Sequence, residues 1–204
     1  MVEKSGWVNI TDANPDHSTW YIERFRKMAA AGDDLAGEAR LVDAMAPRNA
    51  RILDAGCGPG RTGAFLAELG HQVIGIDVDP VLIAAAEEDH PGPTWLVGDL
   101  AELDLAQHGT EHEFDVIVSA GNVMTFLAPS TRRQVLSRLG DHLADTGRIV
   151  LGFGSGRDYE FADFFTDVES ANLVVDLKLS AWDVRPFNDD SDFLVAILSK
   201  PPTA

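Results

Sequence analysis

ILDAGCGPGRTG, residues 52–63, is the stretch of sequence that decides the fold of this chain. Its apolar start ends in Asp54, glycines follow at every second position, and a helical pattern comes next, which predicts a strand that turns tightly into a helix. Glycines tolerate positive φ and let a ligand approach main-chain N–H groups without a Cβ in the way. The N-terminus of the following helix adds oriented amide donors. The turn therefore indicates a site for a nucleoside-like cofactor.

A second acid supports this interpretation. Asp77 ends the next apolar run, QVIGI at residues 72–76. A doubly wound sheet places an acid at this point to accept hydrogen bonds from ribose hydroxyls. The glycine turn and the distal acid together are a stronger indication than either feature alone.

Two classes of cofactor fit the glycines, because residues 58–63 also satisfy the G-x-G-x-x-G spacing of dinucleotide sites. The acid just ahead of the turn, Asp54, distinguishes the two classes. A diphosphate beside this carboxylate would be repelled by roughly 1 to 4 kcal/mol, whereas an ammonium or sulfonium would be attracted. A NAD- or FAD-dependent oxidoreductase stays as the alternative to a protein that binds a cationic nucleoside.

Residues 53–60, with Asp77 downstream, resemble the first two motifs of the class I S-adenosylmethionine-dependent methyltransferases. The order of elements extends the resemblance over residues 50–199, because this family ends its sheet with an antiparallel hairpin. The resemblance implies S-adenosylmethionine as cofactor and methyl transfer as activity. A protein that binds S-adenosylmethionine without catalysis is a further alternative.

The expected fold is α/β: a three-layer α-β-α sandwich with a mostly parallel seven-stranded sheet, a C-terminal antiparallel hairpin and preceding N-terminal helices. We expect one domain over residues 1–204, with a helical lid at 1–48 and a Rossmann-like cofactor-binding core at 49–204. Helices are predicted at 19–30, 34–46, 61–69, from Asp79-Pro80 toward Glu88, at 130–143 and within 159–171. Strands are predicted at 50–55, 72–77, 94–97, 114–119, 148–153, 173–182 and 192–199.

The resemblance also implies which residues bind the cofactor. The first acid and its turn contact the methionine part: Asp54, Ala55, Gly56, Cys57, Gly58 and Gly60. The ends of the following strands contact the nucleoside: Asp77 at the ribose, Val78 beside the adenine, Asp99 at the adenine amine, Leu100 lining the base, and Ala120 and Gly121 under the cofactor. From the N-terminal helix, Tyr21 or Arg24 reaches the cofactor carboxylate, and an arginine would bind it as a bidentate pair.

The sequence assigns no catalytic residue. Transfer of a methyl group by in-line displacement demands positioning and desolvation more than acid–base groups. A general base is needed only where the acceptor loses a proton. Five candidates are expected near the mouth of the site: His17, Tyr21, Asn122, Asp158 and Tyr159. Two of them have structural alternatives, since Asn122 also suits a left-handed loop position and Asp158 also suits the N-cap of a helix that begins at Tyr159.

The acceptor is expected to be a small molecule. Sixteen basic against 33 acidic residues give a formal charge of −17, which repels nucleic acid and anionic membranes. Residues 120–123 lack the Asn/Asp-Pro-Pro-aromatic pattern of the branch that methylates amino groups of nucleic acids. Arg24, Arg61 and Arg157 are expected to approach the mouth, which favours an anionic acceptor. The pair Arg132-Arg133 is predicted to lie on a solvated helix face.

Cys57 is the only cysteine, which excludes an intrachain disulfide and a multi-cysteine metal site. We expect no metal. The first residues lack an apolar run of signal-peptide length, so we expect no signal peptide, and no later run approaches the ~20 apolar residues that span a bilayer. The chain is therefore expected in the cytoplasm, and the sequence predicts no oligomeric state.

Overall fold

The computed structural model describes residues 2–109 and 113–202. Its centre is a seven-stranded sheet with the strand order β3-β2-β1-β4-β5-β7-β6. Strands β1 to β5 run parallel, and β7 pairs antiparallel with both β5 and β6. The strands are β1 (Arg51–Ala55), β2 (Gln72–Asp77), β3 (Thr94–Val97), β4 (Phe114–Ser119), β5 (Leu143–Gly154), β6 (Val174–Leu179) and β7 (Phe193–Ser199).

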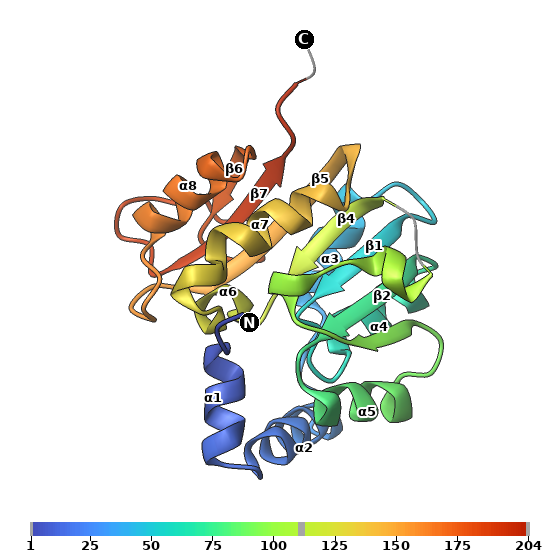
Figure 1. Cartoon of the computed structure of the whole chain (residues 1–204). Helices are drawn as coiled ribbons and strands as arrows, with labels where there is room; N and C mark the ends of the chain where they lie inside the picture. Colours follow the sequence, from blue (N-terminus) through green and yellow to red (C-terminus); the bar gives the residue numbers. More distant parts are fainter. Residues whose placement is uncertain (1, 110–112, 203–204) are drawn as a thin grey trace.

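Helices cover both faces of this sheet (Figure 1). The α-helices are α1 (Gly6–Ala13), α2 (His17–Ala30), α3 (Gly37–Met45), α4 (Arg61–Glu68), α5 (Pro80–Asp89), α6 (Val123–Phe126), α7 (Arg132–Asp141) and α8 (Phe161–Ser170). Three short 3-10 helices complete the set: η1 (Leu100–Glu102), η2 (Leu105–His108) and η3 (Pro129–Thr131).

The core divides into two layers because successive strand residues point to opposite faces. Leu53 of β1 packs with α7 and α8 on one face, in the cluster that contains Leu136 and Phe164. Its neighbour Ile52 packs with α3 and α4 on the other face, beside Val42 and Leu66. Central strands that are buried on both faces are typical of a parallel sheet. The predicted three-layer sandwich with its C-terminal antiparallel hairpin is confirmed.

The strand order positions the site. The chain crosses from β1 outward to β2 and β3, then returns to place β4 on the other side of β1. In open α/β sheets, ligands bind at such a reversal, outside the carboxyl ends of the strands. The segments that follow β1, β2, β3 and β4 therefore meet at one edge of the sheet. Figure 1 shows α1, α2 and α5 gathered at this edge, and the last strand runs to the opposite end.

Several predicted boundaries are wrong. The helix expected at 130–143 ends at Asp141, and β5 begins at Leu143 instead of residue 148. The register explains the early start, because Phe114 pairs with Leu143 and then Val116 pairs with Arg148, so the intervening residues form an irregularity in the ladder. The strand predicted at 173–182 stops at Leu179.

Two helices were not predicted at all, α1 and α6. Ser5 caps α1, because its Oγ accepts a hydrogen bond from the amide of Val8. Helix α1 spans only eight residues and none of them is buried, so the sequence pattern over this stretch is too short to identify the helix. Helix α6 spans only four residues, too few to show a period.

Candidate functional site

The predicted turn between β1 and α4 is present, and we call residues 56–60 the glycine turn. Gly56, Gly58 and Gly60 have φ values of 80°, 55° and 84°. A Cβ on Gly56 would lie 2.5 Å from a methyl carbon of Val123, so space as well as conformation requires glycine there. Gly60 is the N-cap of α4, and the helix begins at Arg61.

The indole of Trp95, from β3, packs beneath the glycine turn. A Cβ on Gly60 would lie 2.9 Å from its Cη2 atom, and a Cβ on Gly75 of β2 would lie 2.3 Å from its ring. Trp95 Nε1 donates a hydrogen bond to the carbonyl of His90, at 3.0 Å, which fixes the ring. The turn is therefore supported from the side that faces the sheet.

Asp54 lies behind the turn and is only 2% exposed. Its Oδ2 accepts a hydrogen bond from the amide of Gly63, in the first turn of α4, at 2.9 Å. Burial raises the pKa of Asp54 to about 7, although this hydrogen bond opposes the shift. The carboxylate thus joins β1 to α4 and lies beside the turn in a site that a positive charge would stabilise.

Asp77, at the end of β2, faces the same space as the glycine turn. Its Oδ2 accepts from the amide of Gly58 and its Oδ1 from the amide of Asp79, each at 2.9 Å. Burial raises the pKa of Asp77 to about 6, and these two hydrogen bonds oppose the shift. An ionised carboxylate has about four acceptor positions, so Asp77 keeps capacity for further donors.

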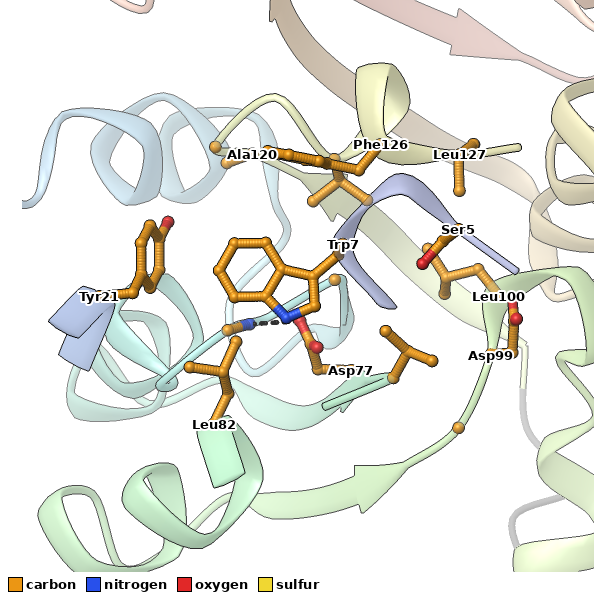
Figure 2. A pocket seen from close by; sticks show the side chains of 16 residues that line it. Ser5, Trp7, Tyr21, Asp77, Leu82, Asp99, Leu100, Ala120, Phe126 and Leu127 are labelled. Carbon is orange, nitrogen blue, oxygen red and sulfur yellow. Dashed lines mark hydrogen bonds between the residues drawn. The ribbon is translucent and has the colours of Figure 1, made fainter. Parts of the chain in front are cut away.

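These groups surround a cavity of about 80 Å³ at the sheet edge, which we call the nucleoside cavity (Figure 2). Its walls come from the glycine turn, the ends of β2, β3 and β4, and the N-terminal segment. The lining residues are Ser5, Trp7, Tyr21, Gly56, Gly58, Asp77, Val78, Leu82, Gly98, Asp99, Leu100, Ala120, Gly121, Val123, Phe126 and Leu127.

The structure brings most of the sequence-predicted cofactor residues to this cavity. Nine of them line it: Tyr21, Gly56, Gly58, Asp77, Val78, Asp99, Leu100, Ala120 and Gly121. Four others form the buried strand end and the turn next to it: Asp54, Ala55, Cys57 and Gly60. Burial also raises the pKa of the Cys57 thiol well above its usual value, so the thiol stays protonated. The remaining residue, Arg24, lines a neighbouring cavity.

Asp99 has two interactions at once. It lines the nucleoside cavity, and its Oδ1 accepts a hydrogen bond from the amide of Ala101 at 2.9 Å, which caps η1. The local turn therefore holds the carboxylate in place at the cavity wall.

Sequence reasoning missed Trp7, whose ring lies across the nucleoside cavity in Figure 2. Its indole contacts the rings of Tyr21, Phe126 and His17 edge-on, with centroids 5.2, 5.6 and 5.1 Å apart. The available signal was Ser5 as an N-cap two residues ahead of Trp7. The other residues that the sequence missed come from four segments, the start of α1, α5, the end of β3 and α6: Ser5, Leu82, Gly98, Val123, Phe126 and Leu127.

A second cavity, of about 480 Å³, adjoins the first, and we call it the α2 cavity. Both cavities are lined by Trp7, Tyr21, Gly121 and Phe126, so the two are neighbours. The other lining residues are His17, Trp20, Arg24, Phe25, Met28, Asp34, Leu35, Glu38, Arg61, Asn122 and Arg157. The three arginines expected at the mouth do meet here.

The guanidinium of Arg61 is already bound to protein groups. Its two terminal nitrogens bind Glu38 at 2.8 and 2.7 Å, and one of them also binds the carbonyl of Leu35. Burial acts against ionisation of Glu38, yet the Arg61 guanidinium outweighs it and lowers the pKa of this carboxyl. This pair links α3 to α4 and removes Arg61 from the charges that can attract an acceptor.

Two of the candidate bases are wrong. Tyr159 is fully buried, its hydroxyl donates to Asp167 at 2.7 Å, and burial raises its pKa further above the usual value. Asp158 does not cap α8, which begins at Phe161 with Glu160 as its N-cap. Neither residue lines either cavity.

The other candidates do lie at the cavities. Asn122, with a φ of 66°, accepts a hydrogen bond from the amide of Gly154 at 2.9 Å and also lines the α2 cavity. The left-handed loop position is confirmed, and a role toward substrate stays a prediction. His17 lines the same cavity.

Arg132 corrects another expectation. It is buried instead of solvated, because its guanidinium carbon lies 4.1 Å from the ring centroid of Tyr159 and its Nη2 donates to the carbonyl of Asp158.

Within residues 2–109 and 113–202, no group of three His, Cys, Asp or Glu side chains could hold a metal ion. No helix in that part of the chain is long and apolar enough to cross a bilayer.

Comparisons with known proteins agree with this geometry. A family model described as a methyltransferase domain matches residues 52–147. A crystal structure of a TehB-like SAM-dependent methyltransferase from Corynebacterium glutamicum is 49% identical, with a TM-score of 0.87, and the match covers 92% of this chain and 100% of that one. A SAM-bound magnesium protoporphyrin IX methyltransferase from Synechocystis shares the fold, with a TM-score of 0.61 at 20% identity over 80% of this chain and 76% of that one.

Curated relatives match a shorter part of their own length. The magnesium-protoporphyrin O-methyltransferase of Rhodobacter capsulatus is 30% identical over 66% of this chain and 57% of its own. A probable S-adenosylmethionine-dependent methyltransferase of Mycolicibacterium smegmatis is also 30% identical, over 66% of this chain and 52% of its own. The chain thus spans about half the length of these curated relatives. Together with the glycine turn, the two acids and the sheet order, these matches show that the chain belongs to the class I S-adenosylmethionine-dependent methyltransferases.

Proposed function

We propose that this protein transfers the methyl group of S-adenosylmethionine to a small-molecule acceptor. The observation that carries the proposal is the pair of adjoining cavities at the sheet edge, one with the acids and apolar walls of a nucleoside site and one with room for an acceptor. The class of enzyme comes from the family. The choice of a small acceptor comes from the α2 cavity.

The residues present fit this cofactor. Asp77 is buried and accepts hydrogen bonds from the amides of Gly58 and Asp79, and it offers its remaining acceptor positions to ribose hydroxyls. Val78, Leu82 and Leu100 provide an apolar surface of the kind that holds a flat base. Asp99, held by its turn, accepts from the amine of that base. The glycine turn leaves its main-chain groups open to a ligand.

A cationic ligand suits the charges of this site better than a diphosphate does. When bound, S-adenosylmethionine supplies a methyl group on a positively charged sulfonium centre. The leaving group of the transfer is a neutral thioether, which needs no acid catalyst. Asp54 and Asp77 both lie at the turn and both become anionic near neutral pH. They attract a positive centre and repel a diphosphate, which disfavours the nicotinamide or flavin alternative.

The acceptor is small because of the size of the α2 cavity and the charge of the chain. A volume of about 480 Å³ falls within the range of about 300–1,000 Å³ for small-molecule pockets. The formal charge of −17 repels nucleic acid phosphates. Relatives differ in their acceptors, since one is named a magnesium-protoporphyrin O-methyltransferase and another an 18S rRNA (guanine-N(7))-methyltransferase. We also propose that residues 1–204 form one domain, in which residues 1–48 are a lid over the cofactor site. We place the protein in the cytoplasm, because a reducing compartment suits a chain whose single cysteine, Cys57, can form no intrachain disulfide.

Isothermal titration calorimetry tests the cofactor. S-adenosylmethionine and S-adenosylhomocysteine are expected to bind, and NAD and FAD are expected not to bind. Tight binding of NAD or FAD, with no binding of S-adenosylmethionine or S-adenosylhomocysteine, would overturn the proposal.

Methyl-labelled S-adenosylmethionine tests the transfer. Purified protein is incubated with the labelled compound and with small-molecule extract, and label is expected in an extract component. Binding of the cofactor without transfer to any extract fraction would instead support a sensor that has no methyltransferase activity.

A further inference from the structure

Helix α2 presents one face of unusual composition to the α2 cavity. His17, Trp20, Tyr21, Arg24 and Met28 line it, at the three- and four-residue spacing that places side chains on one side of a helix. The Trp20 side chain is 55% exposed, although tryptophan rings are on average highly buried in proteins. We call the aromatic side chains of this face, His17, Trp20 and Tyr21, the aromatic shelf. Exposed aromatic rings beside a cavity are typical of a surface that binds a flat ligand.

The same helix is fixed in position. Ser18, on its other side, donates a hydrogen bond to Asp79 at 2.5 Å, and Arg26 binds Asp89 through two nitrogens at 2.8 Å each. Both acceptors belong to the start and end of α5. The shelf is therefore a preformed surface, and a ligand that binds there does not have to order it.

The charges in the α2 cavity leave two arginines without an acidic partner. Asp34 is paired with Arg40 at 2.6 Å, and Glu38 is paired with Arg61. In the part of the chain that the structure describes, neither Arg24 nor Arg157 makes an ion pair. The chain as a whole has 33 acidic and 16 basic residues. Against this background, the unpaired guanidiniums of Arg24 and Arg157 give the α2 cavity a local positive charge.

Arg157 belongs to a different wall of the cavity, in the segment between β5 and α8. Its Nε lies 3.5 Å from the position of a Cβ on Gly154, and the Asn122 carboxamide lies 3.7 Å from the same point. Since Asn122 is itself bound to the amide of Gly154, this wall is also held in place. The aromatic residues of α2 and the two arginines, one on α2 and one after β5, thus line the same cavity.

From these contacts we propose that the α2 cavity binds an aromatic carboxylic acid as the methyl acceptor. The ring lies against Trp20 and its neighbours on α2, and the carboxylate is anchored by Arg24 and Arg157, because arginine binds carboxylates through two parallel charge-assisted hydrogen bonds. The inference rests on the proposed function.

The anchored carboxylate is not the nucleophile, since the guanidinium hydrogen bonds occupy its lone pairs. A lone pair on another atom of the acceptor forms the bond to the methyl carbon while the methyl–sulfur bond breaks. The electron pair of that bond stays on sulfur, and a hydroxyl or amine acceptor releases its proton to solvent.

Calorimetry on the protein saturated with S-adenosylhomocysteine tests the acceptor class. The probes are benzoate, 2-naphthoate and indole-3-acetate, each paired with its primary amide, which keeps the ring and removes the charge. At least one acid is expected to bind about tenfold more tightly than its amide, as charge-assisted hydrogen bonds allow. This preference is expected to weaken at high salt because the arginines are exposed.

Three arginine variants locate the preference. Arg24→Gln and Arg157→Gln are expected to remove the preference for the acid and to change the affinity for S-adenosylhomocysteine less than about twofold. Arg133→Gln is the matched control, because Arg133 lies on α7 at a different cavity, and it is expected to keep the preference.

The outcomes separate this inference from the function on which it rests. If S-adenosylhomocysteine does not bind, the proposed function fails. If it binds and no acid is preferred over its amide, the acceptor class is wrong and the proposed function stands. If Arg24→Gln weakens the binding of S-adenosylhomocysteine instead of the binding of the acid, Arg24 holds the cofactor carboxylate and the proposed acceptor site is wrong.

Discussion

The indole nitrogen of Trp7 lies 2.8 Å from a carboxylate oxygen of Asp79 and donates a hydrogen bond to it. Asp79 is also the N-cap of α5, where its other oxygen accepts from the amide of Val81, and it receives the hydroxyl of Ser18. One buried carboxylate therefore joins α1, α2 and α5. This connection holds Trp7 across the nucleoside cavity.

The size of that cavity predicts that α1 moves. It measures about 80 Å³, whereas pockets that bind small ligands usually measure about 300–1,000 Å³. Trp7→Phe keeps a ring and removes the hydrogen bond to Asp79. We expect association and dissociation of S-adenosylhomocysteine to become roughly tenfold faster, the effect of one hydrogen bond to a charged group. Stopped-flow fluorescence measures both rates, and unchanged rates in Trp7→Phe would show that α1 does not control entry.

Asp77→Asn tests the ribose contact. The amide keeps the size of the side chain but loses one acceptor and the charge, so affinity for S-adenosylmethionine and S-adenosylhomocysteine is expected to fall by at least roughly tenfold. Both ligands are affected because both carry the ribose. The control is Asp145→Asn, because Asp145 is exposed and lies near the amino end of β5, at the opposite end of the strand from the site. Equal affinities for the two variants in calorimetry would remove Asp77 from the site.

Burial of Asp54 makes the stability of the fold depend on pH. Its pKa is about 7 in the folded protein and about 3.9 in unfolded chains, so the folded state binds the proton more tightly. Its contribution is complete below pH 4 and is lost as pH rises through 7. Asp54→Asn removes this dependence.

The measurement is urea unfolding of both proteins at pH 5 and pH 8. Relative to the natural protein, Asp54→Asn is expected to gain about 2 kcal/mol of unfolding free energy between these pH values. A constant difference would mean that Asp54 is already ionised at pH 5 in the fold.

The Glu38–Arg61 pair is expected to contribute to stability. Its side chains are only 19% and 20% exposed, and Glu38→Gln removes the charge and one of the two oxygens that accept from the guanidinium. We expect a loss of about 1.5–3 kcal/mol in unfolding free energy, as for hydrogen bonds to charged groups. The matched control is Asp34→Asn, which breaks an exposed pair with Arg40 and is expected to have almost no effect. Similar urea midpoints for the two variants would contradict this assignment.

The sequence predicted most of the sheet because each strand carries its own signal. The run that ends at Asp54, the turn glycines and the acid at Asp77 are local patterns, and the structure places them as expected. The C-terminal hairpin followed from alternation over residues 173–199. These features depend on neighbouring residues in the chain, which is what sequence periodicity reports.

The errors concern contacts between distant residues. Trp7 is fixed by Asp79, 72 positions away, and Arg61 by Glu38, 23 positions away. Nothing in the local sequence of either residue shows its partner. Tyr159 follows the strand β5 and was therefore expected at the mouth, but its ring stacks on Phe153 in the core, with centroids 5.6 Å apart.

Trp95 gives the glycine motif a second meaning. Because its indole occupies the space where side chains at Gly60 and Gly75 would lie, these glycines are required by the fit between strand and turn as well as by any ligand above it. Replacing Gly75 by alanine would force the indole away and disturb the turn from below, without touching the cavity. A descendant of this chain that had lost its cofactor would still have to keep these glycines, so the motif records the architecture of the fold for longer than it records the chemistry.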